Sequence, residues 1–257
     1  MRIIEYRGKM LRVAERIEEF TPAQYRRYLE ISIMADRGII DRAGLRSKLL
    51  TMLLNESIDI SIQDERTSLE AFKLIRITDP FIVSRDRRDR LNLETGENLL
   101  KEWNGWFGPG DMLSGLTFGK FIDCDTLLKL IARSEWAEER ERLTVDFCKK
   151  MYSCPSCRDS TPDELLCAHS LVLYNNVMQC LHNDLVDFNG ERLNFSILFE
   201  KSDKRKPDDH TGWTGAAMDI AETGVFGTYQ QVVNTQLWDV LLFLYRKKFD
   251  YLHNHSK

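Results

Sequence analysis

The sequence contains few residues that interrupt regular structure. Its 257 residues include only 14 glycines and 6 prolines, and this low content argues against long disordered or collagen-like tracts. No apolar run reaches the roughly 18 to 20 residues that a membrane-spanning helix requires. The first residues, Met1 to Arg7, carry charges where a secretory signal would be apolar. We therefore expect a cytosolic protein without a membrane segment.

The chain also lacks a strong charge of either sign. Its formal net charge is -4, with 30% charged and 43% hydrophobic residues, which is the composition of a soluble globular protein. A chain this close to neutral has no global attraction to nucleic acid or to an anionic membrane. The length suffices for one large hydrophobic core or two small ones, and we expect a single domain over residues 1–257.

No motif of a catalytic or cofactor-binding site is present. Gly105, Gly108 and Gly110 do not follow a strand and open a helix, as a dinucleotide-binding loop would. No phosphate-binding loop with lysine and serine or threonine occurs. Cys154 and Cys157 do not lie in a recognisable nucleophile motif. We therefore expect no enzymatic activity and no cofactor.

The beginning of the chain predicts a small β-hairpin followed by helices. Apolar and charged residues alternate over residues 1–15 and the alternation breaks at Gly8, which is typical of a hairpin. Thr21 followed by Pro22 predicts a helix start, because threonine caps exposed amides and proline suits the first helical position. A second helix is expected from Asp41, which is followed by leucines at helical spacing.

Two further helix starts lie in the middle of the chain. Thr117 and Asp123 are candidate caps for a helical segment running toward Ile131. The run Ser160 to Glu164 combines a capping hydroxyl, a proline at the first helical position and two acidic residues at the positive end of the helix dipole. That helix is expected to run to about His182.

The end of the chain predicts a loop and a last long helix. The mixed-charge stretch 199–211 contains a proline, which predicts an exposed loop. An amphipathic helix is expected from near Thr235. The predicted fold class is therefore mainly α, a helical domain with a small N-terminal β-hairpin.

Two segments each allow two interpretations. The charged stretch Ser84 to Arg90 is either a phosphate-binding patch or a solvated loop whose aspartates neutralise part of the charge, and we favour the loop. The aromatic residues Trp103, Trp106 and Phe107 either close over a core or form a binding surface. Core packing is favoured, because aromatic side chains mostly serve burial.

The six cysteines raise the question of a metal site. Cys154 and Cys157 have the two-residue spacing that lets both sulfurs bind one zinc ion, and Cys167 and His169 follow. The pattern is only partly favourable for zinc binding, because Cys167 and His169 lie inside the predicted helix. Residues two apart on a helix point about 200° apart around its axis. The alternative is small, buried, reduced thiols near a helix N-terminus. Zinc therefore stays an open candidate for these four residues.

The C-terminal segment from Thr211 to Lys248 combines small residues, aromatic residues and an amphipathic pattern. Such a surface suits a partner's helix lying in an apolar groove, and the alternative is helix packing within the chain. The candidate partner-binding residues are Trp213, Ala217, Ile220, Phe226, Trp238 and Leu241.

Short blocks along the chain carry a family resemblance. They are Tyr6-Arg-Gly-Lys, Phe20-Thr-Pro-Ala-Gln-Tyr, Glu97-Asn-Leu-Leu, Gly108-Pro-Gly-Asp, Leu116-Thr-Phe-Gly-Lys-Phe-Ile-Asp, Gly212-Trp-Thr-Gly and Ile220-Ala-Glu-Thr-Gly-Val-Phe-Gly. On these blocks the chain resembles the tail-assembly or tail-structural proteins of double-stranded DNA phages and prophages of Bacteroidetes-type hosts. The entry into the first helix after a small hairpin is similar to that of tail-assembly chaperones. Each block is short, and none is a catalytic signature.

The resemblance implies binding to a tape-measure protein or a neighbouring tail component, in the cytoplasm of the bacterial host and without a cofactor. The predicted function is therefore non-enzymatic, chaperone-like binding during tail assembly. Two alternatives stay open: a neck or connector subunit that remains in the virion, and a zinc-stabilised module that interacts with protein or nucleic acid. Self-association of the chain is left open as well, and the cysteine pair departs from the family pattern.

Overall fold

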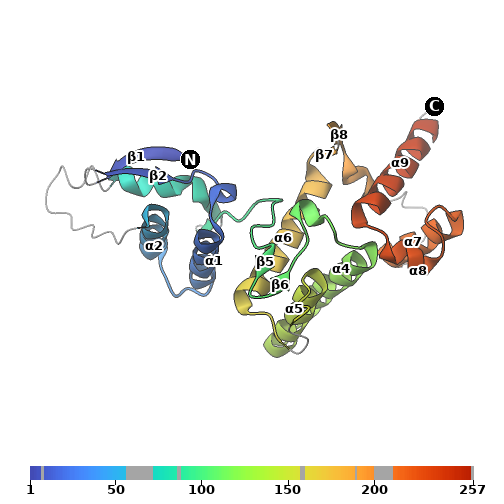
Figure 1. Ribbon diagram of the computed structural model, residues 1–257, viewed down its shortest axis with the longest axis horizontal. Coiled ribbons are helices and arrows are strands. Elements are labelled where there is room, and N and C mark those ends of the chain that lie inside the picture. The colour runs from blue at the N-terminus through green and yellow to red at the C-terminus, as the bar shows by residue number, and fades with distance from the viewer. Residues whose placement is uncertain are drawn as a thin grey trace. The chain divides into compact units, whose positions relative to one another are not determined.

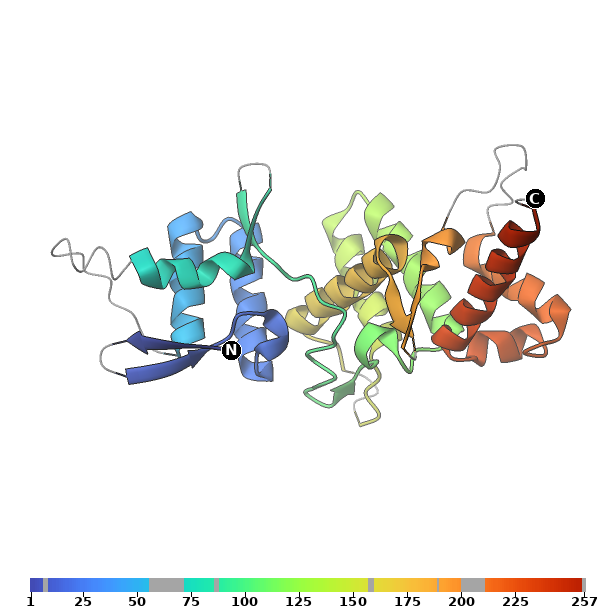
Figure 2. The ribbon, with the colours of Figure 1, turned by 90° about the horizontal axis from the view of Figure 1, so that it is seen from above.

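The computed structural model describes residues 1–6, 9–55, 72–85, 88–156, 160–188, 190–199 and 211–255. Within these ranges the chain is mainly α-helical with a few short antiparallel strand pairs, which confirms the predicted fold class (Figures 1 and 2). Its contacts divide into two compact units, Met1–Thr95 and Gly96–Lys257, where we expected a single domain. No helix in the described part of the chain is both long and apolar enough to cross a membrane.

The first unit opens with the predicted hairpin. Strands β1 (Arg2–Tyr6) and β2 (Lys9–Val13) pair in antiparallel fashion, with Ile4 opposite Leu11. The turn expected at Gly8 lies outside the described residues. The strand pattern therefore follows the alternation of apolar and charged residues in the sequence.

Two antiparallel helices follow the hairpin, and both begin at the predicted caps. Thr21 forms a capping box at the start of α1 (Pro22–Asp36), and Asp41 accepts a backbone amide at the start of α2 (Arg42–Leu54). Asn55 ends α2 with a φ of 53°, in the left-handed region that asparagine tolerates better than most residues. Local capping chemistry therefore fixes these helix ends.

A 3-10 helix and a second hairpin complete the first unit. They are η2 (Arg76–Phe81), β3 (Ile82–Arg85) and β4 (Arg88–Leu91). The buried Tyr28 hydroxyl lies 3.1 Å from the last carbonyl oxygen of η2 and 2.6 Å from that of Asn92. These two hydrogen bonds tie α1 to both ends of the hairpin. The core of the unit includes Tyr25, Tyr28, Leu29, Ile31, Leu45, Leu49 and Phe81.

Three long helices form the centre of the second unit: α4 (Phe118–Arg133), α5 (Ala137–Met151) and α6 (Glu164–Asn183). Tyr174 lies among them, with its ring centroid 5.8 Å from that of Phe121 and 5.4 Å from that of Phe147. All three rings are buried. Large aromatic side chains therefore hold α4, α5 and α6 together, since each buries a large apolar area.

Short elements precede and follow these helices: β5 (Glu102–Trp103), β6 (Trp106–Phe107), η3 (Asp111–Leu113), β7 (Val186–Phe188), β8 (Glu191–Leu193) and η4 (Phe195–Leu198). The loop expected at 199–211 lies almost wholly outside the described residues. Three more helices then complete the unit: α7 (Gly212–Thr223), α8 (Tyr229–Asn234) and α9 (Leu237–His255).

The C-terminal helices are anchored on the start of α4. The amide of Phe118 donates to the carbonyl oxygen of Thr235 at 2.9 Å, and the amide of Leu237 donates to that of Leu116, also at 2.9 Å. A Cβ atom on Gly119 would lie 2.9 Å from the carbonyl oxygen of Val233. Glycine therefore permits the close approach of α4 to the end of α8.

Candidate functional site

The four candidate zinc ligands are not brought together among the described residues. Cys154 is disulfide-bonded, so its sulfur is not a free thiolate, and Cys157 lies outside the described ranges. Cys167 and His169 lie two residues apart on α6, and both are buried. Where the structure is described, no group of three or more His, Cys, Asp or Glu side chains is placed to hold a metal ion.

Of the other four described cysteines, three are buried and Cys180 is half-buried. Cys124, Cys148, Cys167 and Cys180 form no disulfide, as expected for reduced thiols, whereas Cys154 differs from that expectation. Burial raises the pKa of Cys124 to about 12. A hydrogen bond with Cys167, together with burial, raises the pKa of Cys148. Cys124 and Cys148 are therefore protonated at neutral pH, and a protonated thiol is a poor nucleophile and a poor metal ligand.

His169 belongs to a buried polar cluster around Asn98, which we call the Asn98 centre. The Asn98 side-chain amide donates to the carbonyl oxygen of Pro109 at 2.7 Å. Its oxygen accepts from the Leu100 amide at 2.9 Å and lies 2.8 Å from His169 Nε2. The Tyr152 hydroxyl lies 3.2 Å from the same oxygen and 3.1 Å from the Leu100 carbonyl oxygen. One asparagine thus joins the loop before α4 to the end of α5 and to α6.

The burial of His169 decides its chemical role. Only 1% of the residue is exposed, and burial lowers its pKa to about 3. The ring is therefore neutral at neutral pH, and its Nε2–H donates to the Asn98 oxygen. A nitrogen that carries this hydrogen is not available to a metal ion. His169 consequently holds the loop in place.

The tryptophans of the preceding loop also serve packing. Trp103 and Trp106 are buried, which confirms the core interpretation, while Phe107 is exposed. The Trp103 Nε1–H donates to Asp163 Oδ2 at 2.7 Å. The other oxygen of Asp163 accepts the Leu166 amide at 2.8 Å, so Asp163 is the N-terminal cap of α6. The helix start expected within Ser160 to Glu164 is confirmed, but a carboxylate caps it instead of a hydroxyl, and the first helical residue is Glu164 instead of Pro162.

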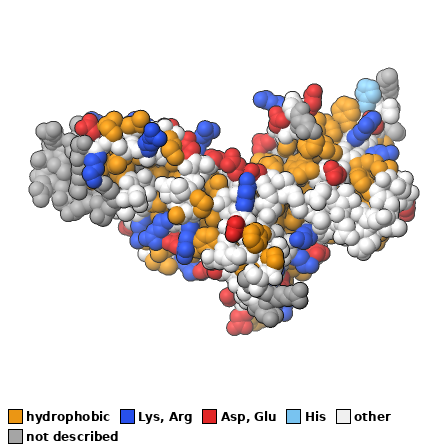
Figure 3. Space-filling model, in the orientation of Figure 1, with side chains coloured by type: hydrophobic (Ala, Val, Ile, Leu, Met, Phe, Trp, Pro, Cys, Tyr) orange, Lys and Arg blue, Asp and Glu red, His pale blue; other side chains and the backbone are white. Residues whose placement is uncertain are grey.

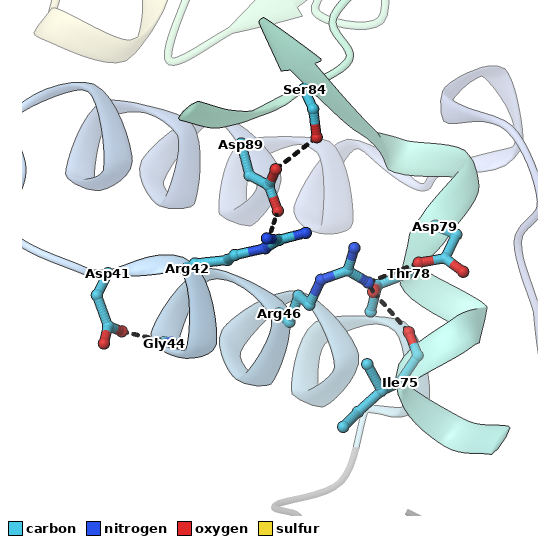
Figure 4. A network of polar contacts seen from close by, with 9 residues as sticks. All are labelled: Asp41, Arg42, Gly44, Arg46, Ile75, Thr78, Asp79, Ser84 and Asp89. Carbon is cyan, nitrogen blue, oxygen red and sulfur yellow. Dashed lines mark hydrogen bonds and ion pairs between the residues drawn. The ribbon is translucent and has the colours of Figure 1, made fainter. Parts of the chain in front are cut away.

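The charged stretch in the first unit forms a hairpin where we expected a loop. Figure 4 shows Asp89 of β4 between Ser84 and Arg42. The Ser84 hydroxyl donates to one carboxylate oxygen at 2.6 Å, and Arg42 Nε lies 2.7 Å from the other. Arg46 pairs similarly with Asp79 at 2.6 Å. The first ion pair ties α2 to β4 and the second ties α2 to η2. Asp89 thus neutralises a cation outside the charged stretch, where the loop interpretation expected it to neutralise the stretch itself.

All six candidate partner-binding residues belong to the second unit, which covers them wholly or in part. Ala217, Ile220 and Leu241 are buried, and the other three are half-buried. The Trp213 ring centroid lies 5.3 Å from that of Phe121. Trp238 donates from Nε1 to the carbonyl oxygen of Met112 at 2.8 Å, and the rings of Phe226 and Phe243 lie 5.5 Å apart. These six side chains therefore make the intramolecular packing that was the alternative to partner binding.

Other apolar side chains of this region are exposed on α7, in the turn that follows it and at the start of α8. Met218 is 52% exposed and Val225 is 59% exposed, and Tyr229 is exposed at the start of α8. We call these three residues the α7–α8 surface. Sequence reasoning missed them, because Met218 lies between the buried residues Ala217 and Ile220 on α7, whereas Val225 lies beyond the left-handed Gly224 that ends this helix.

No protein-family model, curated protein or solved structure matches this chain.

Proposed function

We propose that this chain is a non-enzymatic phage or prophage protein that binds another tail component during tail assembly, through the α7–α8 surface. The observation that carries the proposal is the exposure of three large apolar side chains within the short segment Met218 to Tyr229. Exposed apolar surface of this kind is typical of protein interaction sites. Binding would cover it and release the water that it now orders.

The family resemblance supports the choice of partner. Two of its blocks, Gly212-Trp-Thr-Gly and Ile220-Ala-Glu-Thr-Gly-Val-Phe-Gly, form α7 and the turn that follows it. The same segment therefore carries both the resemblance and the exposed apolar residues. A long helical protein such as a tape-measure protein offers a complementary apolar stripe. An amphipathic helix binds to a partner through apolar residues that recur along one of its faces.

Co-expression with the tape-measure protein of the same phage or prophage tests the proposal. We expect the two proteins to purify together through an affinity tag on either one. The double substitution Met218→Asp/Val225→Asp is expected to weaken the association roughly 30-fold or more, because it buries two carboxylates in the interface. Both side chains are exposed, so the thermal unfolding of the free variant should stay close to that of the wild type.

The matched control is Ile39→Asp, since Ile39 is also exposed but lies in the first unit. It should leave the association unchanged. Absence of any complex with the wild type, or binding by the double variant at full strength, would contradict the proposal. Mass spectrometry of purified particles then separates the roles: a chaperone is absent from the particle, whereas a connector subunit is present in stoichiometric amount.

A further inference from the structure

The last turns of α9 carry a basic and aromatic surface. Arg246 and Lys247 are exposed, Phe249 is 53% exposed and Tyr251 is 51% exposed. Figure 3 shows basic and hydrophobic side chains next to one another in this part of the molecule. We call these four residues the α9 basic end. It combines cations with aromatic rings, which are the residue types enriched in protein interfaces.

The turn between α4 and α5 carries the opposite combination. Trp136 is 74% exposed, the highest value among the large hydrophobic residues of the described chain. A shallow hollow of about 890 Å³ lies between its side chain and Arg142. Three exposed glutamates flank the tryptophan. We call the following residues the α4–α5 tip: Glu135, Trp136, Glu138 and Glu139.

From this complementarity we propose that the α9 basic end of one copy of the chain docks on the α4–α5 tip of a second copy. Arg246 and Lys247 carry charges opposite to those of Glu138 and Glu139, so the two surfaces attract each other. The rings at the α9 basic end fill the hollow beside Trp136, and a buried tryptophan is a frequent anchor of protein interfaces.

The arrangement within the second unit determines the kind of assembly. Figure 1 shows the C-terminal end of α9 projecting away from α4 and α5. The two surfaces of one copy therefore do not cover each other, and each is open to another copy. Contacts between two different surfaces build closed rings or open filaments. The residues are separate from the α7–α8 surface, so this association and the proposed function are tested independently.

Sedimentation velocity of the full chain over a concentration series tests the association first. We expect the wild type to form larger species as its concentration rises, and less so at high salt, which screens the charge pairs. Trp136→Ala should weaken the association roughly 30-fold, with thermal unfolding unchanged because the side chain is exposed. Leu185→Ala, at another exposed apolar side chain, is the matched control and should associate like the wild type.

A charge exchange tests the pairing itself. The tail variant is Arg246→Glu/Lys247→Glu and the tip variant is Glu138→Lys/Glu139→Lys, and each should remain monomeric alone. An equimolar mixture should associate again, because the reversed end of one variant faces the reversed tip of the other, and their unchanged end and tip also carry opposite charges. Circular dichroism of each variant establishes that it is folded, since the glutamates at the start of α5 also favour the helix dipole.

The outcomes are clear in either direction. Restored association in the mixture supports head-to-tail docking of α9 on the α4–α5 tip. A wild type that stays monomeric at every soluble concentration overturns the proposal. Association that survives both charge reversals, or that the mixture of folded variants does not restore, also overturns it.

Discussion

Replacing Asn98 by alanine is expected to lower the free energy of unfolding of the second unit by about 3–5 kcal/mol. The substitution removes a side chain that is 3% exposed. Several buried polar groups then lose their hydrogen-bond partner. The Leu100 amide and His169 Nε2–H lose their acceptor, and the Pro109 carbonyl oxygen loses its donor. An unsatisfied buried polar group costs about 1–3 kcal/mol, and the loss of partners for these groups together accounts for the expected decrease.

Tryptophan fluorescence during urea unfolding measures this effect selectively. All five tryptophans lie in the second unit, so their emission reports on that unit even if the first unfolds separately. Asn175→Ala is the matched control, because Asn175 is exposed on α6 and should change stability by less than about 0.5 kcal/mol. If Asn98→Ala and Asn175→Ala unfold at the same urea concentration, the Asn98 centre does not hold the unit together.

His169 is expected to make the second unit sensitive to acid. Its pKa is 6.5 in the unfolded chain and about 3 when buried, so below pH 6.5 the unfolded state binds a proton that the folded state rejects. Above pH 6.5 the titration of His169 therefore does not lower the free energy of unfolding. Below pH 6.5 it lowers this free energy by about 1.4 kcal/mol per pH unit as the pH drops toward 3. By pH 4 this one residue should have removed about 3 kcal/mol.

The variant His169→Gln isolates this contribution. Glutamine retains a donor for Asn98 but does not titrate, so the variant should be less stable than the wild type at pH 7 and lose less stability in acid. The difference in unfolding free energy between the two proteins should shrink by about 1.4 kcal/mol per pH unit below 6.5. Two pH profiles that run parallel would show that His169 is not buried in its neutral form.

Local chemistry made part of this fold predictable from the sequence. The hairpin at residues 1–15 and the caps at Thr21, Asp41 and Thr117 were all predicted, and the structure confirms each. A capping side chain acts on an amide two or three residues away, so the information lies within one short segment. The predicted run also contains the start of α6, but its cap is Asp163 instead of a hydroxyl, and this carboxylate also accepts a hydrogen bond from Trp103, which is 60 residues away. Asp123, the other cap expected for α4, lies inside that helix.

Contacts between distant segments account for what the sequence did not predict. Nothing in the composition marks the boundary between Thr95 and Gly96. Asn98 has no distinctive neighbours in the sequence, yet it gathers groups from three separate parts of the unit. The spacing of Cys154 and Cys157 was compatible with metal binding, but neither the disulfide at Cys154 nor the burial of Cys167 and His169 was visible in the sequence.

The apolar residues of the C-terminal helices show the same limitation. The pattern identified Ala217, Ile220 and Leu241 as members of an apolar face, and the structure shows that this face is buried within the unit. An apolar face looks the same in sequence whether it packs on its own chain or on a partner. The exposed residues Met218 and Val225 emerge only when the folded chain shows which side is covered.

Hydrogen–deuterium exchange of the chain with and without its tape-measure protein tests the central claim most directly. Binding through the α7–α8 surface predicts slower exchange in peptides covering residues 212–234 when the partner is added, with peptides from the first unit unchanged. A bound partner that leaves the exchange of residues 212–234 unaltered would contradict the account.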